Sequence, residues 1–146
     1  MKLRILLINP WVYDFAAADV WARPLGILRV AECLSLYDVD FAFIDCMESV
    51  KAKRYGKGKY RREMVEKPDC LKAVPRRFCR YGISLENFNG ALAKSLPVDA
   101  VLITSIMPWW YPGIQKAIEC IRDVSKNTPI ILGGIYATLW HSHAVE

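Results

Sequence analysis

The sequence predicts an α/β domain: a flavodoxin-like (Rossmann-like) parallel sheet with helices on both faces. Two observations support this class. Four short apolar runs have the composition of strands buried on both faces, at residues 2–9 (KLRILLIN), 39–45 (VDFAFID), 99–105 (DAVLITS) and 129–134 (PIILGG). Helical patterns lie between them, and alternating buried strands and helices imply right-handed crossovers and a parallel sheet. With 146 residues, the chain is long enough for one such domain.

Three helices are expected. From Pro24 to about Leu36 the residues are apolar except for Arg29, Glu32 and Ser35, which recur every three residues, as in a helix with a narrow polar stripe. A second helix is expected over residues 85–95, with Ser84 as its N-cap. The third is opened by Pro112, and its apolar positions follow helical spacing at Ile114, Ala117, Ile118 and Ile121.

Counting these four strands along the chain, the expected order in the sheet is 2-1-3-4. A domain of this class continues through another helix and strand, so the chain is expected to be truncated before a fifth strand. The fourth strand then leaves an apolar edge, Ile130 to Leu132, that invites pairing with another chain. A homodimer through this edge is therefore predicted.

The positive charge is concentrated in one segment. The chain carries a net charge of +5, and residues 51–80 hold 12 Lys and Arg against 3 Asp and Glu. Residues 46 to about 83 show neither helical nor strand periodicity. We interpret residues 1–146 as one domain with a basic insertion at about 47–83.

Composition also limits the cellular context and the metal chemistry. No apolar run reaches the roughly 18 residues of a membrane span, so a cytoplasmic protein without a membrane partner is expected. The five cysteines form no C-x-x-C pair, which argues against a disulfide framework or a zinc site. Cys33 and Cys120 fall in predicted helices and are expected to be small buried hydrophobes.

Candidate site residues follow three of the strands. In open α/β sheets the ligand lies beyond the carboxyl ends of the strands, so loops after the first, third and fourth strands are expected to converge on one crevice. Glycines allow close approach of a ligand, hydroxyls can bind phosphate or amide groups, and aromatic rings can form a flat wall. The candidates are Asn9, Pro10 and Trp11 after the first strand, Thr104, Ser105, Met107 and Trp109 after the third, and Gly133, Gly134, Tyr136 and Thr138 after the fourth.

These segments resemble the cobalamin-binding (B12) domain at the N-terminus of many radical SAM proteins. The resemblance covers nearly the whole chain and rests on LLINP, WARPLGIL, FIDC, KPDCLKAVPRRFCRYGI, VLITSIMPWWYPG and PIILGGIYATL. Classical cobalamin domains carry S-x-L after the third strand and G-G after the fourth. Residues 105–107 look like the first of these motifs and Gly133-Gly134 like the second. The resemblance implies that cobalamin is bound by the candidate residues above.

One motif of the family is missing. The D-x-H-x-x-G motif, whose histidine binds cobalt from below, would fall at Asn9, Pro10 and Trp11, and no histidine precedes His141. The resemblance therefore implies cobalamin held by its corrin rim and nucleotide tail, without a protein ligand to the metal.

The resemblance also implies a partner. The C-x-x-x-C-x-x-C motif that holds a radical SAM cluster is absent, so SAM and the [4Fe-4S] cluster are expected only in a missing C-terminal radical SAM domain. This chain would hold the corrin for methyl transfer or radical chemistry and would have no turnover of its own. We assign no catalytic residue and no protein metal ligand.

Two other functions stay open. A flavodoxin-like FMN or nucleotide-binding protein has the same expected fold, but the loop after the first strand lacks the hydroxyl-rich phosphate loop that FMN needs. A nucleic-acid-binding module would use the basic insertion, where aromatic residues alternate with arginines at Tyr55, Tyr60, Phe78 and Tyr81. We rank nucleic acid last, because charged loops are usually only solvated.

Overall fold

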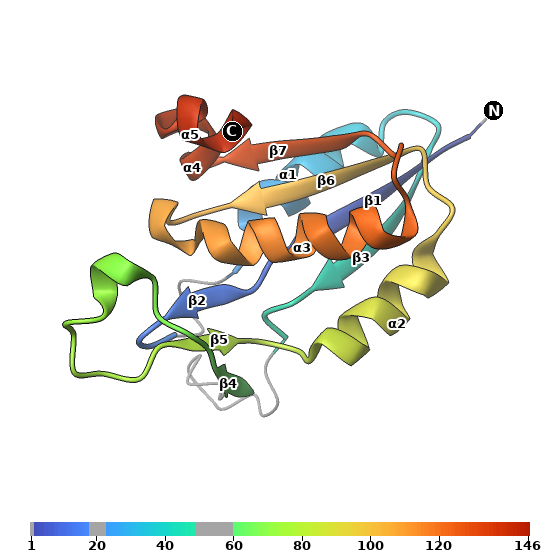
Figure 1. The fold of residues 1–146 in the computed structure, drawn as a ribbon. Coiled ribbons are helices and arrows are strands. Elements are labelled where there is room, and N and C mark those ends of the chain that lie inside the picture. The colour runs from blue at the N-terminus through green and yellow to red at the C-terminus, as the bar shows by residue number, and fades with distance from the viewer. Residues whose placement is uncertain (1, 18–22, 49–59) are drawn as a thin grey trace, which may run out of the picture.

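A four-stranded parallel sheet is the centre of the domain. The structure is a computed structural model that describes residues 2–17, 23–48 and 60–146. The sheet order is β3-β1-β6-β7, from β3 (Val39–Asp45) through β1 (Leu3–Asn9) and β6 (Ala100–Ser105) to β7 (Ile130–Gly134) (Figure 1). The expected α/β class with a parallel sheet is confirmed.

The strand numbers differ from the expected 2-1-3-4, and the reason is a second sheet. Three short strands, β2 (Val12–Asp14), β4 (Arg62–Met64) and β5 (Cys79–Tyr81), form an antiparallel sheet in the order β2-β5-β4. The sequence analysis did not predict them, because a strand of three residues is too short to show a period of two. They interleave with the central strands in chain order, so the central sheet is numbered 3-1-6-7.

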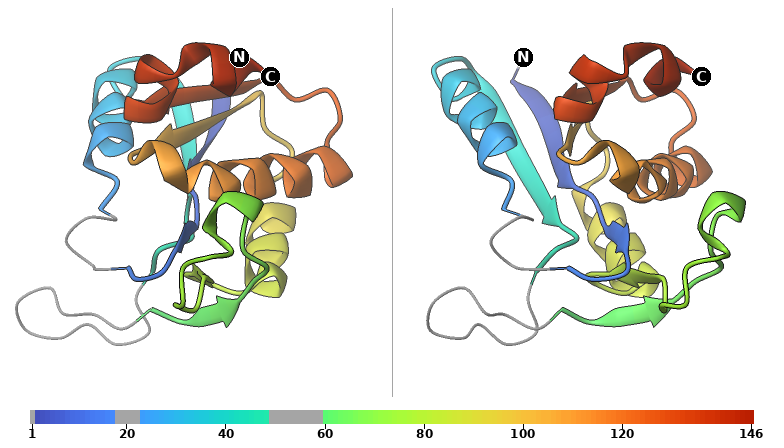
Figure 2. Two further views of the ribbon diagram at one scale, coloured as in Figure 1. Left: turned by 60° about the vertical axis from the view of Figure 1, so that its left-hand side comes forward. Right: turned by 90° about the vertical axis from the view of Figure 1, so that its left-hand side faces the viewer.

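Helices cover both faces of the central sheet. α1 (Leu25–Leu34) lies on one face, and α2 (Leu85–Ser95) and α3 (Tyr111–Val124) lie on the other, as the right-hand view of Figure 2 shows. Two short helices, α4 (Ile135–Leu139) and α5 (His141–Val145), follow β7 at the carboxyl end of the sheet (Figure 1). One-turn 3-10 helices occur at η2 (Asp69–Leu71) and η3 (Pro108–Trp110).

Alternation along β1 explains how one strand serves both layers. Leu6 and Ile8 belong to the large core with Phe88 of α2, whereas Ile5 and Leu7 belong to a smaller core with Ile27 of α1. Successive side chains of a strand point to opposite faces, so a strand covered on both sides must be apolar throughout. The continuous apolar run of β1 is the consequence.

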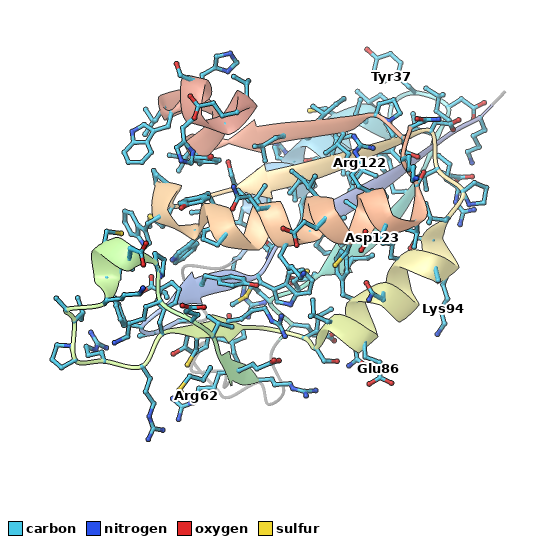
Figure 3. All side chains as sticks on the ribbon, viewed as in Figure 1. Tyr37, Arg62, Glu86, Lys94, Arg122 and Asp123 are labelled. Carbon is cyan, nitrogen blue, oxygen red and sulfur yellow. The ribbon has the colours of Figure 1, made fainter. Side chains whose placement is uncertain are left out.

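The helix starts follow local chemistry. Ser84 Oγ accepts a 3.1 Å hydrogen bond from the Asn87 main-chain N–H, which satisfies a free donor in the first turn of α2. Pro112 occupies the first turn of α3, where a missing N–H costs nothing. Figure 3 shows Glu86 and Lys94 of α2 pointing away from the sheet, so the polar face of this helix is outward.

The second half of the expected basic insertion packs onto the domain. Residues 60–83 contain β4, η2 and β5, and Phe78, Cys79, Arg80 and Tyr81 are buried. The Arg80 guanidinium donates a 2.5 Å hydrogen bond to Glu63 of the neighbouring strand. Residues 49–59, the first part of this insertion and the part that holds Tyr55, lie outside the described residues.

Two further expectations concern cysteines and membranes. Cys120 is buried as expected, but Cys33 is exposed because α1 turns it away from the sheet, so the expectation for Cys33 was wrong. In the part of the chain that the structure describes, no helix has the length and apolar character needed to cross a membrane.

Candidate functional site

Trp11 lies in the core and not at the ligand-facing edge. Its side chain is 1% exposed, its Nε1 donates a 2.7 Å hydrogen bond to the carbonyl of Ile83, and its ring centroid lies 4.6 Å from that of Phe88. Gly113 of α3 lies against its backbone, where a Cβ would come within 1.9 Å of the Trp11 carbonyl oxygen. The Trp11 indole therefore packs inside the core, and we do not keep it among the proposed cofactor contacts.

The loops after β1 and β6 meet, but little space remains between them. Five candidates line one cavity of only about 20 Å³, close to the volume that admits a single water molecule. Its walls are Asn9, Pro10, Trp11, Val12, Met47, Thr104, Ser105, Ile106, Trp110 and Ile114. The crevice between the carboxyl ends of β1 and β6 is thus filled by the side chains of the chain itself.

Asn9 helps to close this crevice. It is buried, and its Nδ2 donates a 2.7 Å hydrogen bond to Asp45 Oδ1 at the end of β3. The same carboxylate oxygen accepts a 2.9 Å hydrogen bond from the Met47 main-chain N–H. Asn9 therefore joins the ends of two strands, which is a structural role that the sequence did not reveal.

The aromatic loop after β6 is held by a carboxylate. Trp109 and Trp110 lie in η3, directly after Met107, and both indoles donate hydrogen bonds to Asp14 Oδ2, at 3.1 and 2.8 Å. Trp109 remains 58% exposed, so its ring still offers an apolar surface at this end of the domain. The loop is therefore bound to β2.

Ser105, Gly134 and Thr138 stabilise the end of β7. Ser105 Oγ donates a 2.6 Å hydrogen bond to the Gly133 carbonyl, and Thr138 Oγ1 donates a 2.9 Å hydrogen bond to the Gly134 carbonyl. Gly134 has φ of +99°, and a Cβ there would lie 2.1 Å from the Ser105 carbonyl oxygen. Both the backbone conformation and the lack of space require glycine at this position.

Tyr136 packs with Tyr111 and His143 in an aromatic cluster that follows the carboxyl end of β7. It is buried, its ring stacks on Tyr111 at 6.3 Å, and its hydroxyl lies 2.7 Å from His143 Nδ1. Burial raises the pKa of the Tyr136 phenol. Tyr136 lies on α4 and His143 on α5, so this contact joins the two short helices. We do not keep Tyr136 among the proposed cofactor contacts.

A larger groove lies near the carboxyl ends of β6 and β7, on the face of the sheet that α1 covers. It has a volume of about 330 Å³, which falls in the range of small-molecule sites. Its walls are mostly apolar and come from α1, β6 and β7: Gly26, Ile27, Val30, Leu102, Ile103, Thr104, Ile131, Gly133 and Gly134. Three candidates, Thr104, Gly133 and Gly134, are thus brought together here, with Gly26 as a residue that the sequence analysis missed.

Two glycines leave this groove open. A Cβ built on Gly26 or on Gly133 would meet no atom within 4 Å, in contrast to the crowded position of Gly134. Neither glycine is therefore required by close packing of the chain against itself. Larger side chains at these positions would project into the groove.

Thr104 supplies the polar group of the groove. The residue is 8% exposed, and its neighbour Leu102, two positions earlier on the same face of β6, packs with the α1 core. The hydroxyl of Thr104 forms no hydrogen bond with the residues that the structure describes, and it is not fully buried, because every fully buried side-chain polar atom among them has a partner. An accessible hydroxyl at the groove wall can donate a hydrogen bond to a molecule in the groove.

The remaining possibilities for the site are limited. Across residues 2–17, 23–48 and 60–146, no three His, Cys, Asp or Glu side chains are placed to hold a metal ion.

Comparisons with protein-family models, with curated proteins and with solved structures find no match. The chemical interpretation of the groove therefore rests on its own residues and on the motifs of the sequence.

Proposed function

We propose that the groove between α1 and the β6–β7 edge binds the nucleotide tail of cobalamin, and that this domain is a cobalamin-binding module. One observation carries the proposal. Two glycines with free space and the Thr104 hydroxyl, which forms no hydrogen bond with a described residue, line the same groove at the carboxyl end of a parallel sheet. The carboxyl end is where open α/β sheets bind ligands.

The groove residues suit the chemistry of such a tail. A benzimidazole is flat and apolar, and the side chains of Ile27, Val30 and Leu102 offer apolar walls. The ribose and phosphate next to it are polar, and the hydroxyl of Thr104 can donate a hydrogen bond to one of their oxygens. The open space at Gly26 and Gly133 allows the main chain to approach the heterocycle closely.

The corrin would have to lie outside the groove, over the ends of the strands. Trp109, exposed at η3, is the aromatic residue that we expect to contact its edge, with Met107 beside it. Both histidines of the chain lie on α5, and neither belongs to the loop after β1. We therefore expect no imidazole of this domain on cobalt.

The proposed assignment includes the finer fold and the partner. The β3-β1-β6-β7 order, with α1 opposite α2 and α3, supports a flavodoxin-like arrangement. Bound cobalamin would supply methyl transfer or radical chemistry, and a radical SAM domain with its [4Fe-4S] cluster and SAM would be the catalytic partner. The side chains of this chain bind and orient the cofactor and have no catalytic role in the proposal.

A titration with hydroxocobalamin, followed by its visible spectrum, tests the proposal. The wild-type protein should bind with benzimidazole released from cobalt and without an imidazole in its place. Gly133→Val should weaken binding at least about tenfold, a loss of about 1.4 kcal/mol, because the branched side chain fills the groove. Thr104→Val, which keeps the shape and removes the hydroxyl, should weaken it in the same direction.

Gly90→Val is the matched control. Gly90 also has no atom within 4 Å of a built Cβ, but it lies on α2 and outside the groove. This variant should bind like the wild type. Equal binding by wild type and Gly133→Val would show that the tail does not enter the groove, and binding of FMN in place of cobalamin would favour the flavodoxin-like alternative.

A further inference from the structure

Residues 60–83 bring an excess of positive charge to the small sheet. They hold seven Lys and Arg against three Asp and Glu. Two of these cations are neutralised, because Arg80 pairs with Glu63 and Lys72 pairs with Asp69, each at 2.5 Å. Five form no ion pair with a described residue: Arg61, Arg62, Lys67, Arg76 and Arg77. Of the three carboxylates, Glu66 alone is left to face them.

The backbone that carries this charge is held in place by hydrogen bonds. β4 and β5 form a regular antiparallel ladder, and the Arg61 carbonyl extends it by accepting a 2.9 Å hydrogen bond from the Gly82 N–H. Lys67 Nζ donates a 2.6 Å hydrogen bond to the Val74 carbonyl, which closes the loop around η2. The sequence left open whether this segment is only a solvated loop. Its arginines instead project from an ordered part of the domain.

Arg61 and Arg77 lie at opposite ends of this ladder. At the end away from Arg61, the Val65 N–H donates a 3.1 Å hydrogen bond to the carbonyl of Phe78, the residue after Arg77. At about 3.4 Å per residue, Val65 lies about 14 Å from Arg61 along the strand. A single phosphate or carboxylate group cannot reach both ends. A nucleic-acid strand can, because it carries one phosphate for about every 3.4 Å of helix axis.

The side chains of this segment fit phosphates better than bases. Phe78 and Tyr81 are buried, so they cannot stack on bases as the sequence suggested. Four of the unpaired cations are exposed arginines, whose guanidinium groups match the oxygens of a phosphate. The Arg76 guanidinium lies 5.6 Å from the centroid of the Phe15 ring, a contact that positions the side chain and leaves its charge available.

This surface is separate from the proposed groove. Figures 1 and 2 show β4 and β5 on the side of the domain remote from β7, and Figure 3 shows Arg62 at the outer border of the domain. A partner that binds the arginines therefore need not displace a molecule from the groove beside β7.

We propose that the arginines of residues 60–83 bind the phosphate backbone of a nucleic-acid duplex. A duplex carries about twice the charge of one strand per unit length, which suits a surface that has exposed cations and no free aromatic platform among its described residues. Contacts to phosphates do not distinguish one base from another, so binding should not depend on sequence and should weaken steeply with salt.

Fluorescence anisotropy with a labelled 20-base-pair duplex, between 50 and 200 mM KCl, tests this proposal on the cofactor-free protein. Replacing both Arg61→Gln and Arg77→Gln should weaken binding at 50 mM KCl at least about tenfold. It should also reduce the slope of log affinity against log salt concentration by about two, one for each lost phosphate contact.

The control removes the same charge elsewhere. Lys94→Gln on α2 combined with Lys126→Gln after α3 replaces two exposed cations outside residues 60–83, and this variant should keep the wild-type slope. Circular dichroism checks the fold of each variant. If the first pair does not fold, Arg62→Gln combined with Arg76→Gln must show the same loss.

Three results would overturn the proposal. They are the absence of binding at 50 mM KCl, an equal loss in the control variant, and competition by polyglutamate as effective as that of unlabelled duplex at equal charge. The last result would assign the surface to an acidic protein. Because no cofactor is present, each of these results leaves the groove proposal unaffected.

Discussion

Trp110 Nε1 donates a 2.8 Å hydrogen bond to Asp14 Oδ2, across 96 positions of the chain. Trp109 Nε1 shares the same oxygen at 3.1 Å, and Asp14 Oδ1 accepts a 2.6 Å hydrogen bond from the Phe15 main-chain N–H. One carboxylate thus connects the small sheet to the aromatic loop at the end of β6. The aromatic loop is held in a defined position that leaves Trp109 exposed.

Asp14→Ala should lower the free energy of unfolding by about 1–3 kcal/mol, because two indole donors lose a charged acceptor. Urea unfolding followed by far-ultraviolet circular dichroism measures the change. Asp69→Ala is the control, since Asp69 forms an exposed ion pair with Lys72 and should change stability by less than about 1 kcal/mol. Equal losses in both variants would contradict a special role for Asp14.

Gly134→Ala should lower the free energy of unfolding, whereas Gly133→Ala should change it little, although the two residues are adjacent. Alanine at 134 must adopt a positive φ and meets the Ser105 carbonyl, so a loss of more than about 2 kcal/mol is expected. Alanine at 133 meets nothing within 4 Å, and stability should stay within about 1 kcal/mol of the wild type. Chemical unfolding of both variants checks this, and similar losses would mean that the space beside Gly133 is not free.

Trp11→Phe should lower stability by about 1–3 kcal/mol, because the Ile83 carbonyl then loses its indole donor inside the core. Thermal and urea unfolding provide the measurement. Trp140→Phe is the matched substitution at an exposed tryptophan, and its effect should fall within about 0.5 kcal/mol. A harmless Trp11→Phe would argue that the buried hydrogen bond contributes nothing to folding.

Stability should fall as the pH rises above about 9. Burial, with a smaller contribution from Asp45, raises the pKa of the Cys46 thiol well above 9.0, so the folded state keeps this proton after the unfolded chain has released it. The stabilisation is complete below the unfolded pKa and is lost as the pH rises toward the folded one. Desolvation also raises the pKa values of half-buried Tyr13 and buried Tyr136 from 10.0, which extends the same loss to higher pH.

The melting temperature between pH 8 and pH 10 measures this effect. Cys46→Ala should melt lower than the wild type at pH 8, because a core side chain is shortened, but should lose less stability between pH 9 and pH 10. Cys70→Ala, at an exposed cysteine, should keep the wild-type slope. Parallel slopes in all three proteins would exclude Cys46 as the source.

The elements of the central domain could be predicted because their information is local. A strand buried on both faces must be apolar, which makes the inner strands β1 and β6 visible in the sequence. The edge strands β3 and β7 are also visible as apolar runs, although part of each is exposed. The start of α2 follows from the side chain of Ser84, which satisfies a donor three residues away. The three-residue strands β2, β4 and β5 carry no such period, and only pairing between distant segments creates them.

The candidate site was predicted only in outline. The sequence determined that glycines, hydroxyls and aromatic residues follow β1, β6 and β7, and that β7 lacks protecting charges. Tertiary packing decided what each group does. It turned Trp11 into the core, used Ser105 to bind the Gly133 carbonyl, and left Thr104 unpaired at the groove among the described residues. A hydroxyl or an indole has the same chemistry in every sequence, and only the neighbours that folding brings within hydrogen-bond distance determine whether it stabilises the chain or remains available to a ligand.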